Sequence, residues 1–71
     1  MKKYYIDGEN QYFDTLADAK YHVGMAYTAK ERVKYLNGCY IVGVKNGEDF
    51  SATEIRVDEN GNYSFGRTTK Y

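Results

Sequence analysis

Apolar and polar side chains alternate at both ends of the chain, whereas the middle repeats with the period of a helix. Alternation with a period of two is typical of half-buried strands. At the N-terminus it flanks Asp7-Gly8, a pair that supplies the backbone freedom of a tight turn, and predicts a hairpin with strands near residues 3–6 and 11–13. In the second half it predicts an antiparallel meander with strands near residues 39–45, 50–57 and 62–68.

The middle segment carries two signals for the start of a helix. Asp14 or Thr15 can cap one helix, and Thr28 opens a capping box with the glutamate three residues further on. Between them lies Gly24, which costs about 1 kcal/mol in a helix interior relative to alanine. The pattern therefore predicts either two helices, near residues 15–24 and 28–36, or one helix that bends near Gly24.

The turns between the predicted strands decide which side chains share a face of the sheet. A three-residue loop, Glu59-Asn60-Gly61, pairs Val57 with Tyr63 and matches apolar with apolar positions. For the preceding hairpin, a two-residue and a four-residue turn at residues 46–49 give the same faces. With either turn, the predicted core face consists of Tyr40, Val42, Val44, Ile55, Val57, Tyr63 and Phe65. The helical side chains expected to cover this face are Leu16, Ala19, Val23, Tyr27 and Val33. The result is a two-layer α+β domain spanning residues 1–71.

The opposite face of the predicted sheet is too apolar to be ignored and too polar to form a second core. Its side chains are those of Cys39, Ile41, Phe50, Ala52, Glu54 and Arg56. Either the N-terminal hairpin covers the apolar end of this face, through Tyr5, Ile6 and Phe13, or the face binds a partner or a second copy of the chain. The sequence leaves both alternatives open, because antiparallel sheets commonly leave one face solvated.

Length and composition narrow the class of protein. A chain of 71 residues buries only about 60% of the surface that its unfolded form exposes, so its core is small. The single cysteine, Cys39, excludes an intrachain disulfide and fits a reducing compartment. The N-terminus lacks the apolar region of a signal peptide, and no apolar run approaches the roughly 20 residues of a membrane span. We therefore expect a soluble, cytoplasmic protein.

Charge gives little indication of a partner, since ten basic residues balance ten acidic ones. Their distribution is uneven. Residues 46–60 are mainly acidic and residues 15–45 mainly basic, which predicts a dipolar molecule.

The candidates for chemistry are few. His22 follows Asp18 by one helical turn, and Cys39 is the only other soft ligand, whereas structural metal sites usually need four ligands. The paired carboxylates at residues 48–49 and 58–59 lie in predicted turns, where water keeps them ionised. No glycine-rich phosphate-binding motif occurs. We therefore predict no catalytic residues, no metal and no cofactor, and expect that the protein is not an enzyme.

The opening pattern, "YYIDG" followed by "QYFDTLADAK", resembles the start of short uncharacterised proteins from bacteria, their phages and other mobile elements. The resemblance covers roughly the first 20 residues and consists of hairpin and helix-capping signals. It implies a stand-alone domain that binds and blocks a larger protein, such as a host or defence complex. It brings no catalytic or ligand-binding residues with it.

Three functional hypotheses follow. The leading one is a non-enzymatic protein-binding module, because tyrosine and arginine are enriched at interface centres. Its candidate contact residues are Ile41, Phe50 and Arg56, the acidic Glu48, Asp49, Asp58 and Glu59, and the tyrosines Tyr5, Tyr12 and Tyr71. The second is a single-strand nucleic-acid binder that uses Lys30, Arg32, Lys34, Arg67, Lys70 and Tyr71. The third is a homo-oligomeric structural subunit, with a homodimer as its simplest form.

Overall fold

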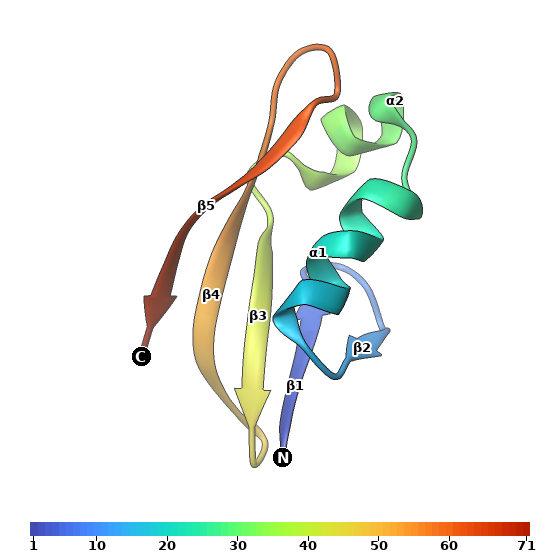
Figure 1. The fold of residues 1–71 in the computed structure, drawn as a ribbon. Coiled ribbons are helices and arrows are strands. Elements are labelled where there is room, and N and C mark those ends of the chain that lie inside the picture. Colours follow the sequence, from blue (N-terminus) through green and yellow to red (C-terminus); the bar gives the residue numbers. More distant parts are fainter.

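A computed structural model describes residues 1–71 as an antiparallel sheet packed against helices (Figure 1). The strands are β1 (Lys2–Ile6), β2 (Tyr12–Phe13), β3 (Tyr40–Lys45), β4 (Glu48–Val57) and β5 (Tyr63–Lys70). The helical segments are α1 (Leu16–Met25), α2 (Ala29–Glu31) and the π-helical turn η1 (Arg32–Leu36). The predicted α+β class is confirmed, and the order of hairpin, helices and meander fits the prediction.

The sheet has five strands, not the three of the predicted meander, because the N-terminal hairpin joins it. The strand order is β2-β1-β3-β4-β5. The β1–β3 ladder extends from Lys2 opposite Lys45 to Ile6 opposite Ile41. A two-stranded hairpin alone is marginally stable in water, and pairing of β1 with β3 adds the further strands that stabilise it. The hairpin therefore widens the sheet and does not fold over the second face.

The two start signals of the middle segment each begin a helix. The Thr15 hydroxyl accepts a hydrogen bond from the Asp18 backbone N–H at 3.0 Å and caps α1. Thr28 and Glu31 form the predicted capping box, with bonds of 2.9 and 3.2 Å. Of the two alternatives, the structure therefore has two helices. Gly24 lies within α1, where the Tyr63 hydroxyl occupies the space that a Cβ would need.

Arg32 joins the two helices to the last hairpin. Its Nε donates to the Gly61 carbonyl at 2.8 Å, and its Nη1 donates to the carbonyls of Tyr27 at 2.7 Å and Gly24 at 3.3 Å. The guanidinium also lies 4.8 Å from the centre of the Tyr63 ring. These contacts satisfy carbonyl groups at the end of α1, where helices leave such groups unpaired.

The core lies between the helices and one face of the sheet. Its buried side chains are Ile6, Ala19, Val23, Leu36, Ile41, Ile55 and Val57. Ala19 and Val23 of α1 were predicted to cover the sheet, and both are fully buried. Val33 was also predicted there but is 40% exposed, and Leu36 from the last turn of η1 takes that place.

The predicted register of the last hairpin is confirmed. Val57 lies opposite Tyr63, and Ile55 lies opposite Phe65. Gly61 adopts a φ of +85°, the left-handed conformation that the three-residue loop requires.

The prediction that Tyr40, Val42 and Val44 share a face with Ile55 and Val57 is wrong, because β4 contains a bulge. A two-residue turn at Asn46-Gly47 places Lys45 opposite Glu48, but one extra residue of β4, Phe50, then shifts the pairing. Ile41 consequently lies opposite Thr53 and faces the helices. One added residue reverses the face of every later pair. The β3 side chains on the other face are therefore those of Tyr40, Val42 and Val44.

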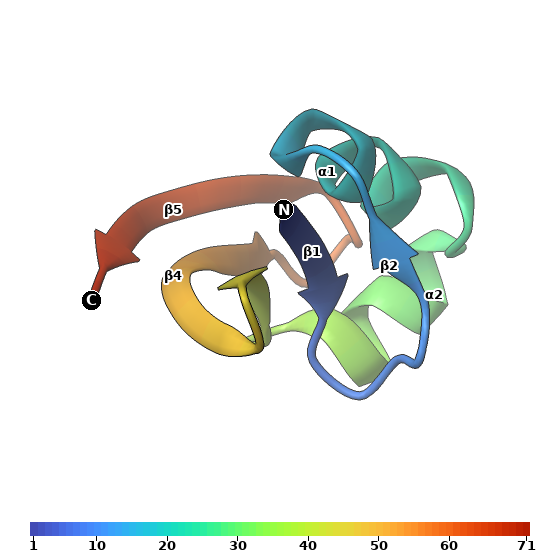
Figure 2. The same cartoon turned by 90° about the horizontal axis from the view of Figure 1, so that it is seen from below.

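Figure 2 shows the sheet curving from β1 through β3 and β4 to β5, with α1 beside both β1 and β5. The Lys20 ammonium lies 5.2 Å from the Phe65 ring centre, and this contact links α1 to β5. The helices thus lie along one side of the sheet. None of them combines the length and apolar character that crossing a bilayer requires.

Candidate interaction surface

The face of the sheet turned away from the core carries an apolar band across four strands. Tyr12 lies opposite Tyr5, Tyr5 opposite Val42, and Val42 opposite Ala52. Residues directly opposite one another on neighbouring strands share a face. Tyr40 and Val44 flank Val42 on β3 and point to the same side. We call this surface the open face, defined by the side chains of Tyr5, Tyr12, Tyr40, Val42, Val44 and Ala52.

The open face has a closed apolar centre and exposed aromatic rings around it. Val42 and Ala52 are only 9% and 8% exposed, although no helix packs on them. Tyr12 and Tyr40 are 59% and 42% exposed. The rings of Tyr5 and Tyr12 meet edge to face, with centroids 5.5 Å apart. This arrangement presents aromatic area at little further cost in side-chain entropy, because the rings already hold one another.

Two aspartates lie at the border of the open face. Asp7 follows Tyr5 by two residues, and its backbone N–H continues the ladder by donating to the Tyr40 carbonyl at 3.0 Å. Asp49 pairs with Val44 at the opposite end of β3. Burial, followed by the charges of Asp49 and then Asp7, raises the pKa of the Tyr5 phenol. Both aspartates are therefore near enough for their charges to act on the Tyr5 phenol.

The ion pairs of the chain leave these two aspartates without a cationic partner. The three pairs are Lys3 with Asp14, His22 with Glu9, and Arg56 with Glu54. Lys3 and Arg56, the two lysine or arginine side chains in these pairs, belong to strands of the sheet, and each has a carboxylate beside it. Asp7 and Asp49 are exposed and take part in none of the pairs.

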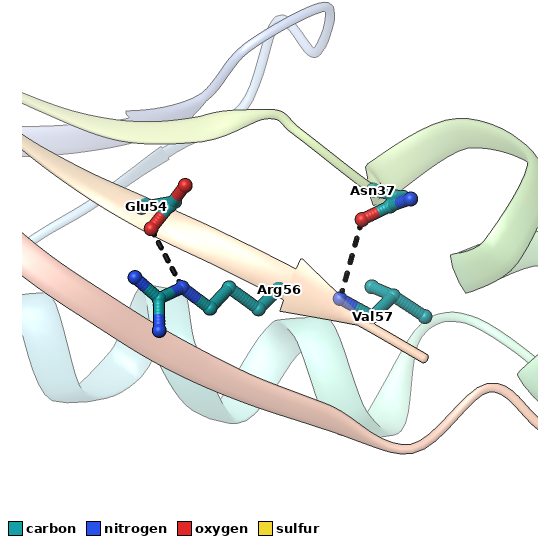
Figure 3. A network of polar contacts seen from close by, with 4 residues as sticks. All are labelled: Asn37, Glu54, Arg56 and Val57. Carbon is teal, nitrogen blue, oxygen red and sulfur yellow. Dashed lines mark hydrogen bonds and ion pairs between the residues drawn. The ribbon is translucent and has the colours of Figure 1, made fainter. Parts of the chain in front are cut away.

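Arg56 lies at the far end of the same side of the sheet, next to Glu54 (Figure 3). It also lines a hollow at that end. Its Nε donates to Glu54 Oε1 at 2.7 Å, and the two side chains lie over Gly66. Across from them, the Asn37 side-chain carbonyl accepts a 3.5 Å bond from the Val57 N–H, where β3 no longer accompanies β4. The hollow has a volume of about 410 Å³ and is lined by Asn37, Arg56, Val57, Asp58, Asn62, Tyr63 and Ser64.

The structure separates the three central residues of the predicted contact surface. Ile41 is fully buried in the core. Phe50 is half-buried on the helix side of the sheet, with its ring 6.0 Å from that of Tyr4. Only Arg56 lies on the predicted side. The bulge at Phe50 is the physical reason, because it exchanges the faces of β3 relative to β4.

The predicted acidic turns lie at opposite ends of β4. Glu48 and Asp49 begin the strand, and Asp58 and Glu59 follow its end. The Asp58 carboxylate organises its own loop by accepting bonds from the backbone N–H groups of Asn60 and Asn62, at 2.9 and 3.0 Å. Burial alone would raise the pKa of Asp58, but these hydrogen bonds outweigh it and lower the pKa.

The remaining predicted tyrosines are Tyr5, Tyr12 and Tyr71, and Tyr71 is one of the smaller causes that raise the pKa of Tyr5. Tyr5 and Tyr12 lie together on the open face. Tyr71 follows β5, donates its backbone N–H to the Phe50 carbonyl at 2.9 Å, and is 76% exposed. Tyr40 and Val42 were missed as surface residues. The one sequence signal of the bulge is Gly43, since a glycine inside a strand often marks one. Here the Phe50 ring and the Ser51 hydroxyl fill the space beside it.

The predicted nucleic-acid residues do not form one surface. Lys30 lies in α2 near the β4–β5 loop, whereas Lys70 pairs with Ser51 at the other end of β5. Lys34 is exposed on η1, and Arg67 is exposed in the middle of β5. The Arg32 guanidinium is bonded to three carbonyls of the fold. None of these side chains belongs to the open face.

The candidates for metal binding or catalysis are also dispersed. His22 pairs through Nε2 with Glu9 Oε1 at 3.2 Å, not with Asp18, and its ring lies between those of Phe13 and Tyr27. No three histidine, cysteine or carboxylate side chains are grouped as a metal site would require. Burial and then Asp7 raise the pKa of the Cys39 thiol, which keeps it protonated.

Comparison with protein-family models, with curated proteins and with solved structures finds no match to this chain. The functional interpretation therefore rests on the geometry of the open face.

Proposed function

We propose that the protein is a non-enzymatic protein-binding module and that its partner docks on the open face. The observation that carries this proposal is the combination of exposed Tyr12 and Tyr40 rings with a closed apolar centre at Val42 and Ala52. Interface centres are rich in tyrosine and poor in charge, and their rims are polar. The open face follows that plan, with Asp7, Asp49 and the Arg56–Glu54 pair around it.

Single-stranded nucleic acid is the second candidate, because bases stack on tyrosine rings that an open sheet presents. The charges favour a protein. The charges of Asp7 and Asp49 act on Tyr5, at the middle of the aromatic group, and would repel phosphates. The predicted basic residues lie away from these rings, and the chain has no net positive charge.

The hydrogen bonds that polar side chains already make within the fold also favour a binding role over a catalytic one. The Cys39 thiol donates to the Tyr35 carbonyl at 3.1 Å and has a raised pKa, which disfavours a nucleophilic role. The Asp58 carboxylate already accepts hydrogen bonds from the backbone of its own loop. The finer proposal, that binding inhibits a larger host or defence complex, rests on the resemblance of the first 20 residues to short phage and mobile-element proteins.

Affinity capture with matched variants tests the proposal. Tagged wild-type protein, the open-face variant Tyr12→Ala/Tyr40→Ala, and the control Tyr21→Ala/Met25→Ala are each exposed to a bacterial lysate, with and without nuclease. Tyr21 and Met25 are each 68% exposed and belong to α1. The control therefore removes a similar apolar area from a different surface.

We expect one protein to be retained by the wild type and by the control, with or without nuclease, and to be lost from the open-face variant. All four replaced side chains are exposed, so the variants should keep the fold, which a ¹⁵N–¹H spectrum of each verifies. Retention by the open-face variant would place the contact elsewhere. Recovery of nucleic acid only from the untreated samples would favour the second candidate. A defined homo-oligomer in sedimentation, with no other partner, would favour a structural subunit.

A further inference from the structure

We propose that the segment of the partner that docks on the open face is basic, and that one of its arginine or lysine side chains lies on Tyr5 between Asp7 and Asp49. This inference rests on the proposed function and adds the chemistry of the partner. It follows from three features of the surface: the register that gathers these residues, the pairing of the cations nearby, and the aromatic rings.

The register places both aspartates on the side of the sheet that carries Tyr5. Asp7 is two residues from Tyr5 on the extension of β1, so both side chains point the same way. Asp49 lies opposite Val44, and Val44 lies opposite Lys3 on β1. The two carboxylates therefore lie toward the two ends of the β1–β3 ladder, and the charges of both act on the Tyr5 phenol.

The cations of the sheet are either neutralised or directed elsewhere. Lys3 is paired with Asp14, and Arg56 with Glu54. Lys2 and Lys45 lie opposite one another and alternate with the open-face residues, and Lys2 reaches the ring of Phe50 on the helix side at 5.3 Å. No cation of this chain is paired with Asp7 or Asp49. A cation of the partner at this surface would be attracted by two carboxylates that have no other counter-ion.

The rings of Tyr5 and Tyr12 complete a site for such a cation. An arginine or lysine over the face of a tyrosine contributes about 0.5–1 kcal/mol at an exposed site and more when water is displaced. The charges of Asp49 and Asp7, which add to the effect of burial on the Tyr5 pKa, would attract a docked cation. Arginine suits the site best, because its planar group stacks on a ring while its N–H groups reach carboxylates.

Other occupants fit these features less well. A nucleic-acid strand would bring phosphates toward Asp7 and Asp49. A second copy that placed its own Tyr5 region against this one would bring four aspartates together. An extended basic segment satisfies the charges and also covers the band from Tyr12 to Ala52.

The test uses three acetylated and amidated heptapeptides, Gly-Arg-Val-Arg-Val-Arg-Gly and the same sequence with each arginine replaced by citrulline or by glutamate. Citrulline has the shape of arginine without its charge. Binding to the ¹⁵N-labelled full chain is followed by chemical-shift changes. We expect the arginine peptide to shift the amides of Tyr5, Tyr12, Val42 and Asp49, and the other two to bind at least about tenfold more weakly.

Two charge variants provide the second measurement. Asp7→Asn/Asp49→Asn removes the two aspartates, and Asp18→Asn/Glu59→Gln changes the net charge equally at exposed positions outside the open face. We expect the first variant to bind the arginine peptide about tenfold more weakly and the second to bind it nearly as wild type. The asparagine side chains suit the turn and the strand end, so both variants should fold, as their spectra will show.

The inference is overturned if the citrulline or glutamate peptide binds as well as the arginine peptide, if the arginine peptide shifts amides outside the open face, if no peptide binds, or if both charge variants lose affinity equally. Its failure is distinguishable from failure of the proposed function. A partner protein that Tyr12→Ala/Tyr40→Ala abolishes but Asp7→Asn/Asp49→Asn leaves unchanged would uphold the open face and reject the basic segment. A dimer of the wild type in sedimentation that Tyr12→Ala/Tyr40→Ala abolishes would identify a second copy as the occupant. That outcome would also reject the basic segment.

Discussion

The two faces of the sheet are built from different kinds of side chain. The helix face centres on aliphatic residues, Ile6, Ile41 and Ile55, each fully buried beneath the helices. The centre of the open face is Val42 and Ala52, which are shielded mainly by their neighbours within the sheet. The comparison shows that low exposure has two origins here. On the helix face it comes from packing between layers, and on the open face from side chains within a single layer.

The largest expected effect is a difference in stability between substitutions at two adjacent residues of β3 that point to opposite faces. Ile41→Ala should lower the free energy of unfolding by about 2–5 kcal/mol, because helices enclose the site and a cavity remains. Val42→Ala should cost about 1 kcal/mol, because water can reach the space that it leaves. Urea denaturation followed by circular dichroism measures both, and Ile41→Val, at about 0.5–1.5 kcal/mol, keeps the measurement possible if Ile41→Ala does not fold. Equal costs for the two alanine variants would show that the open face is packed as tightly as the core.

The next effect concerns the side of the molecule that carries the helices. Arg32→Met should lower the free energy of unfolding by about 1.5–3 kcal/mol, because it leaves carbonyls of Gly24, Tyr27 and Gly61 without their charged donor. Amide hydrogen exchange should accelerate in α1 and η1 more than in β1 and β3. Lys34→Met, at an exposed position of η1, is the matched control and should change stability by less than about 0.5 kcal/mol. If the two variants behave alike, Arg32 does not tie the helices to the last hairpin.

The two hairpins that share β4 show why only part of the fold follows from the sequence. For the β4–β5 hairpin, only one loop length pairs Val57 with Tyr63 and matches apolar positions, and Gly61 supplies the conformation that this loop needs. For the β3–β4 hairpin, both turn lengths give the same faces, so the turn carries no information about a bulge. A single extra residue, Phe50, then reverses the outcome. Gly43 marks the place but does not determine which face results.

The residues of the candidate site were likewise predicted only in part from the sequence. Tyr5 and Tyr12 were identified from the sequence because they flank a turn whose residues define it locally. Tyr40 and Val42 were not, because their exposure depends on the bulge in another strand. Pairing of β1 with β3 depends on contacts between segments far apart in the chain, which local patterns do not encode. Local chemistry therefore identified the rings, and long-range pairing decided which apolar residues accompany them.

The smallest expected effect tests the electrostatic character of the open face. Burial, Asp49 and Asp7 raise the pKa of the Tyr5 phenol above its ordinary value of about 10. The neutral phenol is therefore favoured in the folded state. Its contribution to stability is complete below the unfolded pKa and is lost as pH rises from about 10 through the folded pKa. Titration of the ¹³Cζ signal of Tyr5 in the folded protein above pH 9 measures the shift directly.

Neutralising one aspartate shows whether charge contributes to that shift. Asp49→Asn should move the Tyr5 pKa down toward its ordinary value, and Asp18→Asn on α1 should leave it where it is in the wild type. Because burial is the larger cause, part of the elevation should persist in Asp49→Asn. If Asp49→Asn leaves the Tyr5 titration unchanged, Asp49 does not contribute to the shift and is too far from the ring to hold a cation there. That result would leave burial and Asp7 as the main causes of the shift, and it would leave the difference in packing between the two faces intact.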